Sequence, residues 1–125
     1  MSGIQMLAAP AGRVLIALMF VMSGIGKITA YSGTQGYMEA MGVPGALLPL
    51  VILLEVAGGI AIIVGWQTRL VALALAGFCV ISAILFHANF SDQTQMIMFL
   101  KNIAISGGFL FLVANGPGAY ALDNR

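Results

Sequence analysis

The sequence predicts an all-α integral membrane protein, folded as a four-helix bundle with up-down-up-down topology. Hydrophobic residues make up 61% of the 125 residues and charged residues only 7%, with a mean hydropathy of +1.05. A soluble domain carries roughly 25% charged residues, because its surface must face water. The apolar residues also gather in four segments that each approach the ~20 residues needed to cross a bilayer. We therefore expect one transmembrane domain over residues 1–125, with the lipid bilayer as its surroundings.

Each of the four spans has its own boundary signals. Short polar links join them: a longer loop around "SGTQGYMEAMGVP", a tight turn at "WQTR" and a short loop at "NFSDQTQ". Pro44 precedes the second span and Pro117 follows the fourth, as expected at helix boundaries. Links of this length favour antiparallel neighbours. The predicted spans are Gly12–Tyr31, Gly45–Gly65, Leu70–Ala88 and Met96–Ala114.

The first span could be mistaken for a signal peptide. It is long for one, and "KITAY" offers no small-x-small cleavage site, so we expect it to be retained as a helix.

The arginines predict the orientation of the chain. Arg13 precedes the first span, Arg69 follows the second and Arg125 follows the fourth, whereas the other two loops contain Glu39 and Asp92 but no Lys or Arg. Because loops rich in basic residues stay in the cytoplasm, we expect both termini there.

The composition argues against several classes of function. Five basic and four acidic residues, with a net charge of +1, provide no basic patch for nucleic acid. Cys79 is the only cysteine and His87 the only histidine, so neither a disulfide within the chain nor the usual Cys/His metal site is expected. The sequence contains no P-loop and no dinucleotide-binding glycine motif, so it indicates neither a metal nor a nucleotide cofactor.

Five polar residues inside the spans form the candidate site. Charges at bilayer depth cost at least ~2.5–3.5 kcal/mol each and usually face the bundle interior. At 1.5 Å per residue, the lysine of the first span lies about 6 Å deep and that of the fourth about 7–8 Å deep, both in the outer half. Helical side chains lean toward their own N-terminus, so this first lysine leans toward the carboxylate near the midplane. The residues are Lys27, Glu55, His87, Lys101 and Asn102.

We expect Glu55 to pair chiefly with Lys27, with His87 near the same site and Lys101 at its mouth. Other interpretations stay open at this point. A buried ion pair can simply join two helices, a lysine near a span end can extend to the headgroups, and the histidine can be interfacial. The glycines and serines beside these residues indicate close helix packing, and they also leave room for a flat ring.

The sequence resembles the DoxX family of small bacterial inner-membrane proteins, specifically its short proteobacterial members. The resemblance runs from about Arg13 to Asp123 and rests on motifs in the family's order: "FVMSGIGKITAY", "YMEAMGVPG", "LLEVAGGIAIIVGWQTR", "LFHANF", "KNIAISGG" and "GPGAYALD". It implies a four-helix protein of the bacterial inner membrane, of the kind commonly labelled an oxidoreductase. Relatives named with thiosulfate:quinone oxidoreductase suggest quinone chemistry.

Two classes of function follow from these observations. In the first, Glu55, Lys27 and His87 act on a quinone or quinol that they bind together with Lys101 and Asn102, and a redox partner protein or a freely exchanging quinol supplies electrons. In the second, the protein is not an enzyme, but a small-molecule or proton permease, built as a homo-oligomer, or an assembly subunit of a membrane complex. A lipid-related or stress-related membrane factor is a further, weaker alternative.

Overall fold

The computed structural model describes residues 3–124, and within that range the chain is helical, with no β-strand. Four helical segments are long and apolar enough to cross a membrane. They are α1 (Gly3–Thr29), α3 (Leu48–Val64, extended at its start by the 3-10 turn η1, Gly45–Leu47), α4 (Thr68–Phe86) and α5 (Gln93–Asn115). The predicted all-α membrane bundle with four spans is confirmed.

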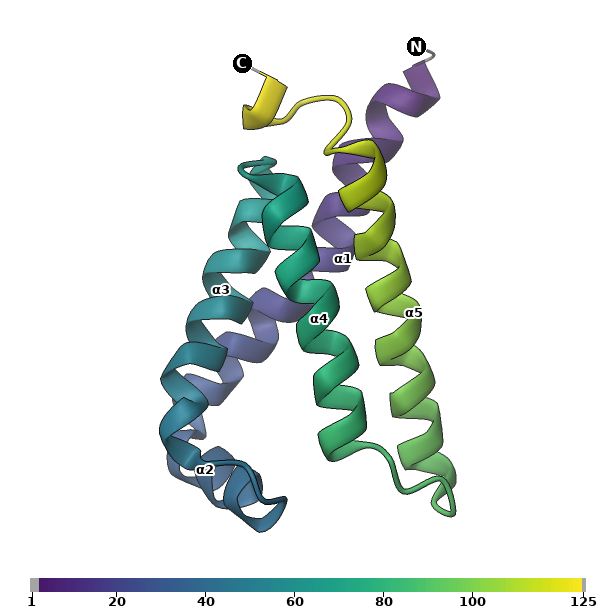
Figure 1. The fold of residues 1–125 in the computed structure, drawn as a ribbon. Helices are drawn as coiled ribbons and strands as arrows, with labels where there is room; N and C mark the ends of the chain where they lie inside the picture. Colours follow the sequence, from purple (N-terminus) through teal and green to yellow (C-terminus); the bar gives the residue numbers. More distant parts are fainter. Residues whose placement is uncertain (1–2, 125) are drawn as a thin grey trace.

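The four spans form two closely packed pairs. Helix α1 packs along α3, and α5 packs along α4, whereas α3 and α4 touch over a shorter stretch. Figure 1 shows α3 and α4 meeting near their connecting turn and diverging toward the opposite end of the molecule. Both chain termini lie at the end where they meet, and the short helix α2 (Tyr31–Ala40) lies at the other. We call these the clasp end and the α2 end.

Small residues bring α1 and α3 together. A Cβ atom at Gly24 would lie 2.5 Å from a methyl group of Val56, and one at Gly59 would lie 2.7 Å from a methyl group of Val21. Helices in a membrane associate through close packing of this kind, because lipid tails provide no hydrophobic driving force. The expected packing role of the glycines is confirmed at these two positions.

The middle of the bundle is apolar, and the buried Arg13 and Thr68 lie beyond it at the clasp end. Residues of α1, α3, α4 and α5 meet in this middle part, and the rings of Phe20 and Phe109 touch edge to face with centroids 5.4 Å apart. The buried cluster comprises Ala17, Phe20, Ile62, Ala72, Leu75, Ala76, Cys79 and Phe109.

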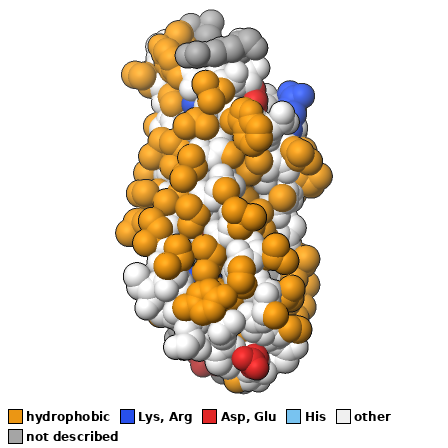
Figure 2. Space-filling model, turned by 90° about the vertical axis from the view of Figure 1, so that its left-hand side faces the viewer, with side chains coloured by type: hydrophobic (Ala, Val, Ile, Leu, Met, Phe, Trp, Pro, Cys, Tyr) orange, Lys and Arg blue, Asp and Glu red, His pale blue; other side chains and the backbone are white. Residues whose placement is uncertain are grey.

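The outer surface suits a lipid environment. Figure 2 shows the face at the left of Figure 1, where hydrophobic side chains cover the height of the molecule and the larger charged groups lie near its two ends. Trp66, Phe111 and many aliphatic side chains are exposed there or on other faces. Exposed apolar residues over the whole span length are expected where the surrounding solvent is hydrocarbon.

The segment after the first span differs from the prediction. We expected a polar loop over "SGTQGYMEAMGVP", but residues Tyr31–Ala40 form helix α2. Met38 is its buried residue, the Gln35 side chain donates a hydrogen bond of 3.0 Å to the Gly45 carbonyl oxygen, and Tyr37 stacks on Phe86. These tertiary contacts hold a helix in a segment whose glycines disfavour one.

The first span also begins earlier than expected. Helix α1 starts at Gly3 rather than Gly12, so Arg13 does not precede the span but lies ten residues inside it, and it is buried. Its Nη2 donates to the carbonyl oxygens of Ala119 and Tyr120, at 3.0 and 2.9 Å. Arg125, the last arginine of the orientation argument, lies outside the described residues. The remaining spans begin and end within three residues of the prediction.

The residues after α5 close the clasp end. The Asp123 carboxylate accepts backbone hydrogen bonds from Gln67 and Thr68, at 2.7 and 2.8 Å, and the Asp123 N–H donates to the Gly65 carbonyl oxygen at 2.9 Å. Gly65 ends α3 with a φ of +73°, and a side chain there would overlap Ala121 and Arg13. We call residues 116–124, held by Arg13 and by the turn of residues 65–68, the C-terminal clasp.

Candidate functional site

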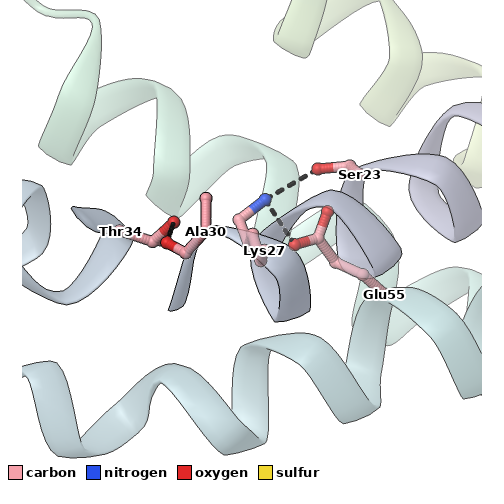
Figure 3. A network of polar contacts seen from close by, with 5 residues as sticks. All are labelled: Ser23, Lys27, Ala30, Thr34 and Glu55. Atoms are coloured by element: carbon pink, nitrogen blue, oxygen red, sulfur yellow. Dashed lines mark hydrogen bonds and ion pairs between the residues drawn. The ribbon is translucent and has the colours of Figure 1, made fainter. Parts of the chain in front are cut away.

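The predicted pairing of Lys27 with Glu55 is confirmed. The Lys27 Nζ of α1 lies 2.7 Å from the Glu55 Oε1 of α3, as Figure 3 shows. The glutamate side chain is 3% exposed and the lysine side chain 28%. Glu55 lies beside Gly24, at a close approach of α1 and α3, because a Cβ at that glycine would contact the Glu55 Cβ at 3.3 Å.

The hydrogen bonds around the pair leave binding capacity on both partners. Lys27 Nζ donates a hydrogen bond of 2.7 Å to the Ser23 hydroxyl oxygen, one turn earlier in α1. Glu55 Oε1, although in ion contact with the ammonium, has no aligned hydrogen bond with any described residue. An ammonium group has three protons to donate, and a carboxylate oxygen can accept more than one. The pair therefore retains both a donor and an acceptor.

The ion pair lies in the wall of a cavity at the α2 end of the bundle. The cavity has a volume of about 330 Å³ and takes its lining from all five α-helices. Ligand cavities of small molecules start at about this size. Its polar lining residues are Ser23, Lys27, Thr34, Tyr37, Glu55, Ser82, His87 and Asn102, and its other lining residues are Met19, Phe20, Met38, Val51, Phe78, Cys79, Phe86 and Met98.

The cavity thus brings together four of the five predicted site residues. Lys27, Glu55, His87 and Asn102 all line it. Lys101 does not: it is exposed on α5, one residue before Asn102.

His87 lies at the end of α4 and is held by the next helix. Its Nδ1 is 2.9 Å from the Gln95 Oε1 in the first turn of α5. In the tautomer in which Nδ1 donates to that oxygen, Nε2 is free of its proton and can accept one from a ligand. The contact also fixes the ring where α4 and α5 connect.

Sequence reasoning missed the contribution of α2 and of the aromatic residues. Thr34 and Tyr37 line the cavity from a segment that we expected to be a loop. Tyr37 stacks on Phe86 of α4, with ring centroids 5.5 Å apart and planes at 23°. The one aromatic residue in "GTQGYMEAM", Tyr37, was the available sequence signal. Its direction toward the cavity could be predicted only once this segment was known to be helical.

The chemistry of the site is acid–base and hydrogen bonding. In the part of the chain that the structure describes, no group of three or more His, Cys, Asp or Glu side chains converges on a point where a metal ion would bind. The cavity offers an ammonium donor, an amide, a carboxylate and an imidazole within mostly apolar walls. Such a set suits a flat, largely apolar ligand with a few oxygen atoms.

Known proteins similar to this chain are membrane proteins. The family model described as DoxX matches residues 8–88. The inner membrane protein YqjF of Escherichia coli (strain K12) is 58% identical over 111 residues, covering 89% of this chain and 85% of that protein. The inner membrane protein YphA of the same organism is 35% identical over 121 residues, covering 90% and 86%. No solved structure matches the chain.

Proposed function

The chain belongs to the DoxX family, and on this basis we propose that it is an inner-membrane protein whose cavity binds the head group of a quinone or quinol for a membrane redox reaction. The observation that carries the proposal is the Lys27–Glu55 ion pair in the wall of a mainly apolar cavity inside the spans. Buried charges stabilise a fold less well than apolar packing does. A pair kept at this depth, with hydrogen-bonding capacity left over, favours a ligand site.

The residues divide between the two ends of such a head group. Lys27 donates a hydrogen bond to a carbonyl oxygen, and the Glu55 carboxylate accepts one from a quinol hydroxyl. His87 and Asn102 come from α4 and α5, across the cavity from the ion pair, and contact the oxygen on the far side of the ring. Phe20, Phe78 and Phe86 provide apolar surface for the ring itself.

Proton transfer is the part of the redox reaction that these residues serve. Reducing a quinone to a quinol adds two electrons and two protons, and oxidising the quinol releases them. Glu55 and His87 are the acid–base groups of the cavity, and Lys27 forms an ion pair with the Glu55 carboxylate. The electrons come from a partner protein or from a second, exchanging quinol.

The geometry supports binding over a continuous transport path. The cavity occupies the α2 end, whereas the buried apolar cluster fills the interior toward the clasp end. A proton or solute permease needs polar groups along the whole path, and between Glu55 and the buried Arg13 the described core is an aromatic and aliphatic cluster without a buried charge.

The test is a search for bound quinone by mass spectrometry in protein purified gently in detergent. Wild type is compared with Glu55→Gln and Lys27→Ala, and with Glu39→Gln as a matched control, because Glu39 is exposed and lies outside the cavity lining. We expect near-stoichiometric quinone in wild type and the control, and about tenfold less or lower in the two cavity variants. Equal background quinone in all four proteins would refute the proposal.

A further inference from the structure

The cavity has an opening on its lipid-facing side, between α1 and α5. Met19 of α1 and Met98 of α5 both line the cavity, yet they are 45% and 42% exposed. We call the gap flanked by these two methionines the side opening. The rings of Phe20 and Phe109 join α1 to α5 beside the side opening, since Phe20 directly follows Met19 in α1.

Contacts between helices close the other walls of the cavity, except where α3 and α4 diverge toward the α2 end. Helices α1 and α3 pack tightly at Gly24 and Gly59, and α4 and α5 pack along their length. At the α2 end, helix α2 covers the cavity, since Tyr37 stacks on Phe86 and Gln35 is bonded to η1. Of the walls between neighbouring spans, the one between α1 and α5 has the fewest close contacts, and the side opening lies in it.

The side opening lies within the depth of the spans. Met19 stands ten residues before the end of α1 and Met98 five residues after the start of α5. At 1.5 Å per residue these positions lie about 15 Å and about 7 Å inside their helices. At such depths the surroundings are hydrocarbon. A methionine rim is apolar, unbranched and flexible, so it adapts to an irregular apolar chain.

We propose that the ligand of this cavity is a tailed amphiphile that enters sideways from the lipid. Its polar head lies against Lys27 and Glu55, and its apolar tail passes between Met19 and Met98 into the bilayer. The inference rests on the cavity of the proposed function and narrows its physiological ligand to a molecule whose apolar tail occupies the side opening.

Lys101 gives the side opening a charge preference. A Cβ at Gly108 would lie 2.9 Å from Ile16 of α1, so that side of α5 faces α1. Lys101 is seven residues earlier, two turns away on the same side, and it is exposed. Lys101 is therefore a cation on the α1-facing side of α5, outside the cavity lining, and a positive charge there disfavours a cationic head group.

The experiment narrows the opening without touching the ion pair. Met19→Trp and Met98→Trp place a large rigid ring at the rim. Met22→Trp and Met96→Trp are matched controls, because these methionines are 64% and 44% exposed on the same two helices but lie outside the cavity lining. Native mass spectrometry identifies the tailed molecules that each purified protein retains. A titration then compares long-tailed ubiquinone with a benzoquinone head group that has no tail.

We expect wild type and both controls to retain one tailed molecule per chain, and the rim variants to bind the long-tailed quinone about tenfold more weakly or worse. Binding of the tail-free head group should change by less than about twofold in the same variants. Together these results would support both the side opening and the quinone site.

The remaining outcomes separate the two proposals. If wild type retains another tailed amphiphile, and the rim variants lose it, the side opening stands and the quinone assignment fails. If the rim variants bind both quinones as wild type does, the quinone site stands and the side opening fails. If wild type neither retains nor takes up any tailed molecule, the side opening is wrong.

Discussion

Glu55 is the residue around which the site is organised. It is buried at the edge of the α1–α3 contact, and Lys27 is its only ion partner among the described residues. Placing an isolated carboxylate in hydrocarbon costs free energy, and pairing it with a lysine lowers that cost. The Ser23 hydroxyl oxygen then orients the ammonium by accepting a hydrogen bond from it. Three side chains on two helices therefore form the ion pair in the cavity wall and its hydrogen bond.

Removing one partner of the pair should cost more stability than removing both. Lys27→Met leaves the Glu55 carboxylate buried without its counter-ion, and we expect a loss of about 3 kcal/mol, at the lower end for such pairs because the lysine is partly exposed. The double variant Lys27→Met/Glu55→Gln should recover at least about half of that loss. Reversible unfolding in mixed micelles measures both. A loss in the double variant equal to the sum of the losses in Lys27→Met and in Glu55→Gln alone would show that the two residues are not energetically coupled.

At the scale of elements, helix α4 depends on a residue far away in the sequence. The position before its first turn, Gln67, has no side-chain cap of its own, and the Asp123 carboxylate accepts from Gln67 N and Thr68 N instead. Helix α5, in contrast, is capped locally, by Asp92 accepting from Thr94 N at 2.9 Å. The α3–α4 turn and the C-terminal clasp therefore stabilise each other.

Asp123 should make stability fall in acid. The pKa of Asp123 lies below its usual range, chiefly because its carboxylate accepts a hydrogen bond from the Thr68 backbone N–H. Burial partly opposes this, while smaller lowering effects come from the Thr68 side chain, the Gln67 N–H and the charge of Arg13. A carboxyl whose pKa is lowered by folding stabilises the protein above the unfolded pKa of ~3.9, and that contribution is lost as pH falls through the lower folded value.

Asp123→Ala should cost about 0.5–2 kcal/mol at neutral pH, as lost helix caps do. Its melting temperature should depend less on pH below about pH 4 than that of wild type. Asp123→Asn is the control, because it keeps an acceptor oxygen but cannot titrate, so it should share the weaker acid dependence with a smaller loss at neutral pH. Thermal unfolding in detergent at neutral and acidic pH measures all three proteins. If the melting temperature of Asp123→Asn falls as steeply in acid as that of wild type, the pH dependence comes from other carboxyl groups.

At the scale of the whole molecule, the two ends of the bundle are built differently. The C-terminal clasp joins α1, the α3–α4 turn and the end of α5 at one end, whereas the cavity separates the two helix pairs at the other. A bundle held together at one end and divided at the other concentrates its binding surface in one half of the membrane. Both termini lie at the clasp end, on the side opposite the cavity.

We expect the clasp end to face the cytoplasm. Arg13 and Arg69 lie toward that end, and the loops at the α2 end contain no Lys or Arg. A C-terminal green fluorescent protein fusion should therefore fluoresce, and an alkaline phosphatase fusion at the same position should be inactive. Alkaline phosphatase fused after Phe90, in the α4–α5 loop, should be active. The reverse pattern would put the cavity in the cytoplasmic half of the membrane.

The family and the number of spans could be predicted from the sequence, and so could the ion pair. Span number follows from the length of apolar runs against a fixed bilayer thickness, which is a local property. The pairing of Lys27 with Glu55 follows from depth and from the lean of helical side chains, which one sequence also contains. Helix α2 was missed because Gly33 and Gly36 disfavour a helix locally, and only its contacts with η1 and Phe86 stabilise one.

The sequence by itself determined that this is a four-span membrane protein of the DoxX family with a carboxylate and a lysine paired inside it. Only the tertiary structure decided that Arg13 is a buried clasp residue, that the cavity takes its lining from five helices, and that Lys101 lies outside that lining. The reason is physical. Each span is recognisable by itself, because its own residues must be apolar enough to leave water for lipid. The clasp and the cavity depend on how the helices pack, since they arise from contacts between residues as much as 107 positions apart.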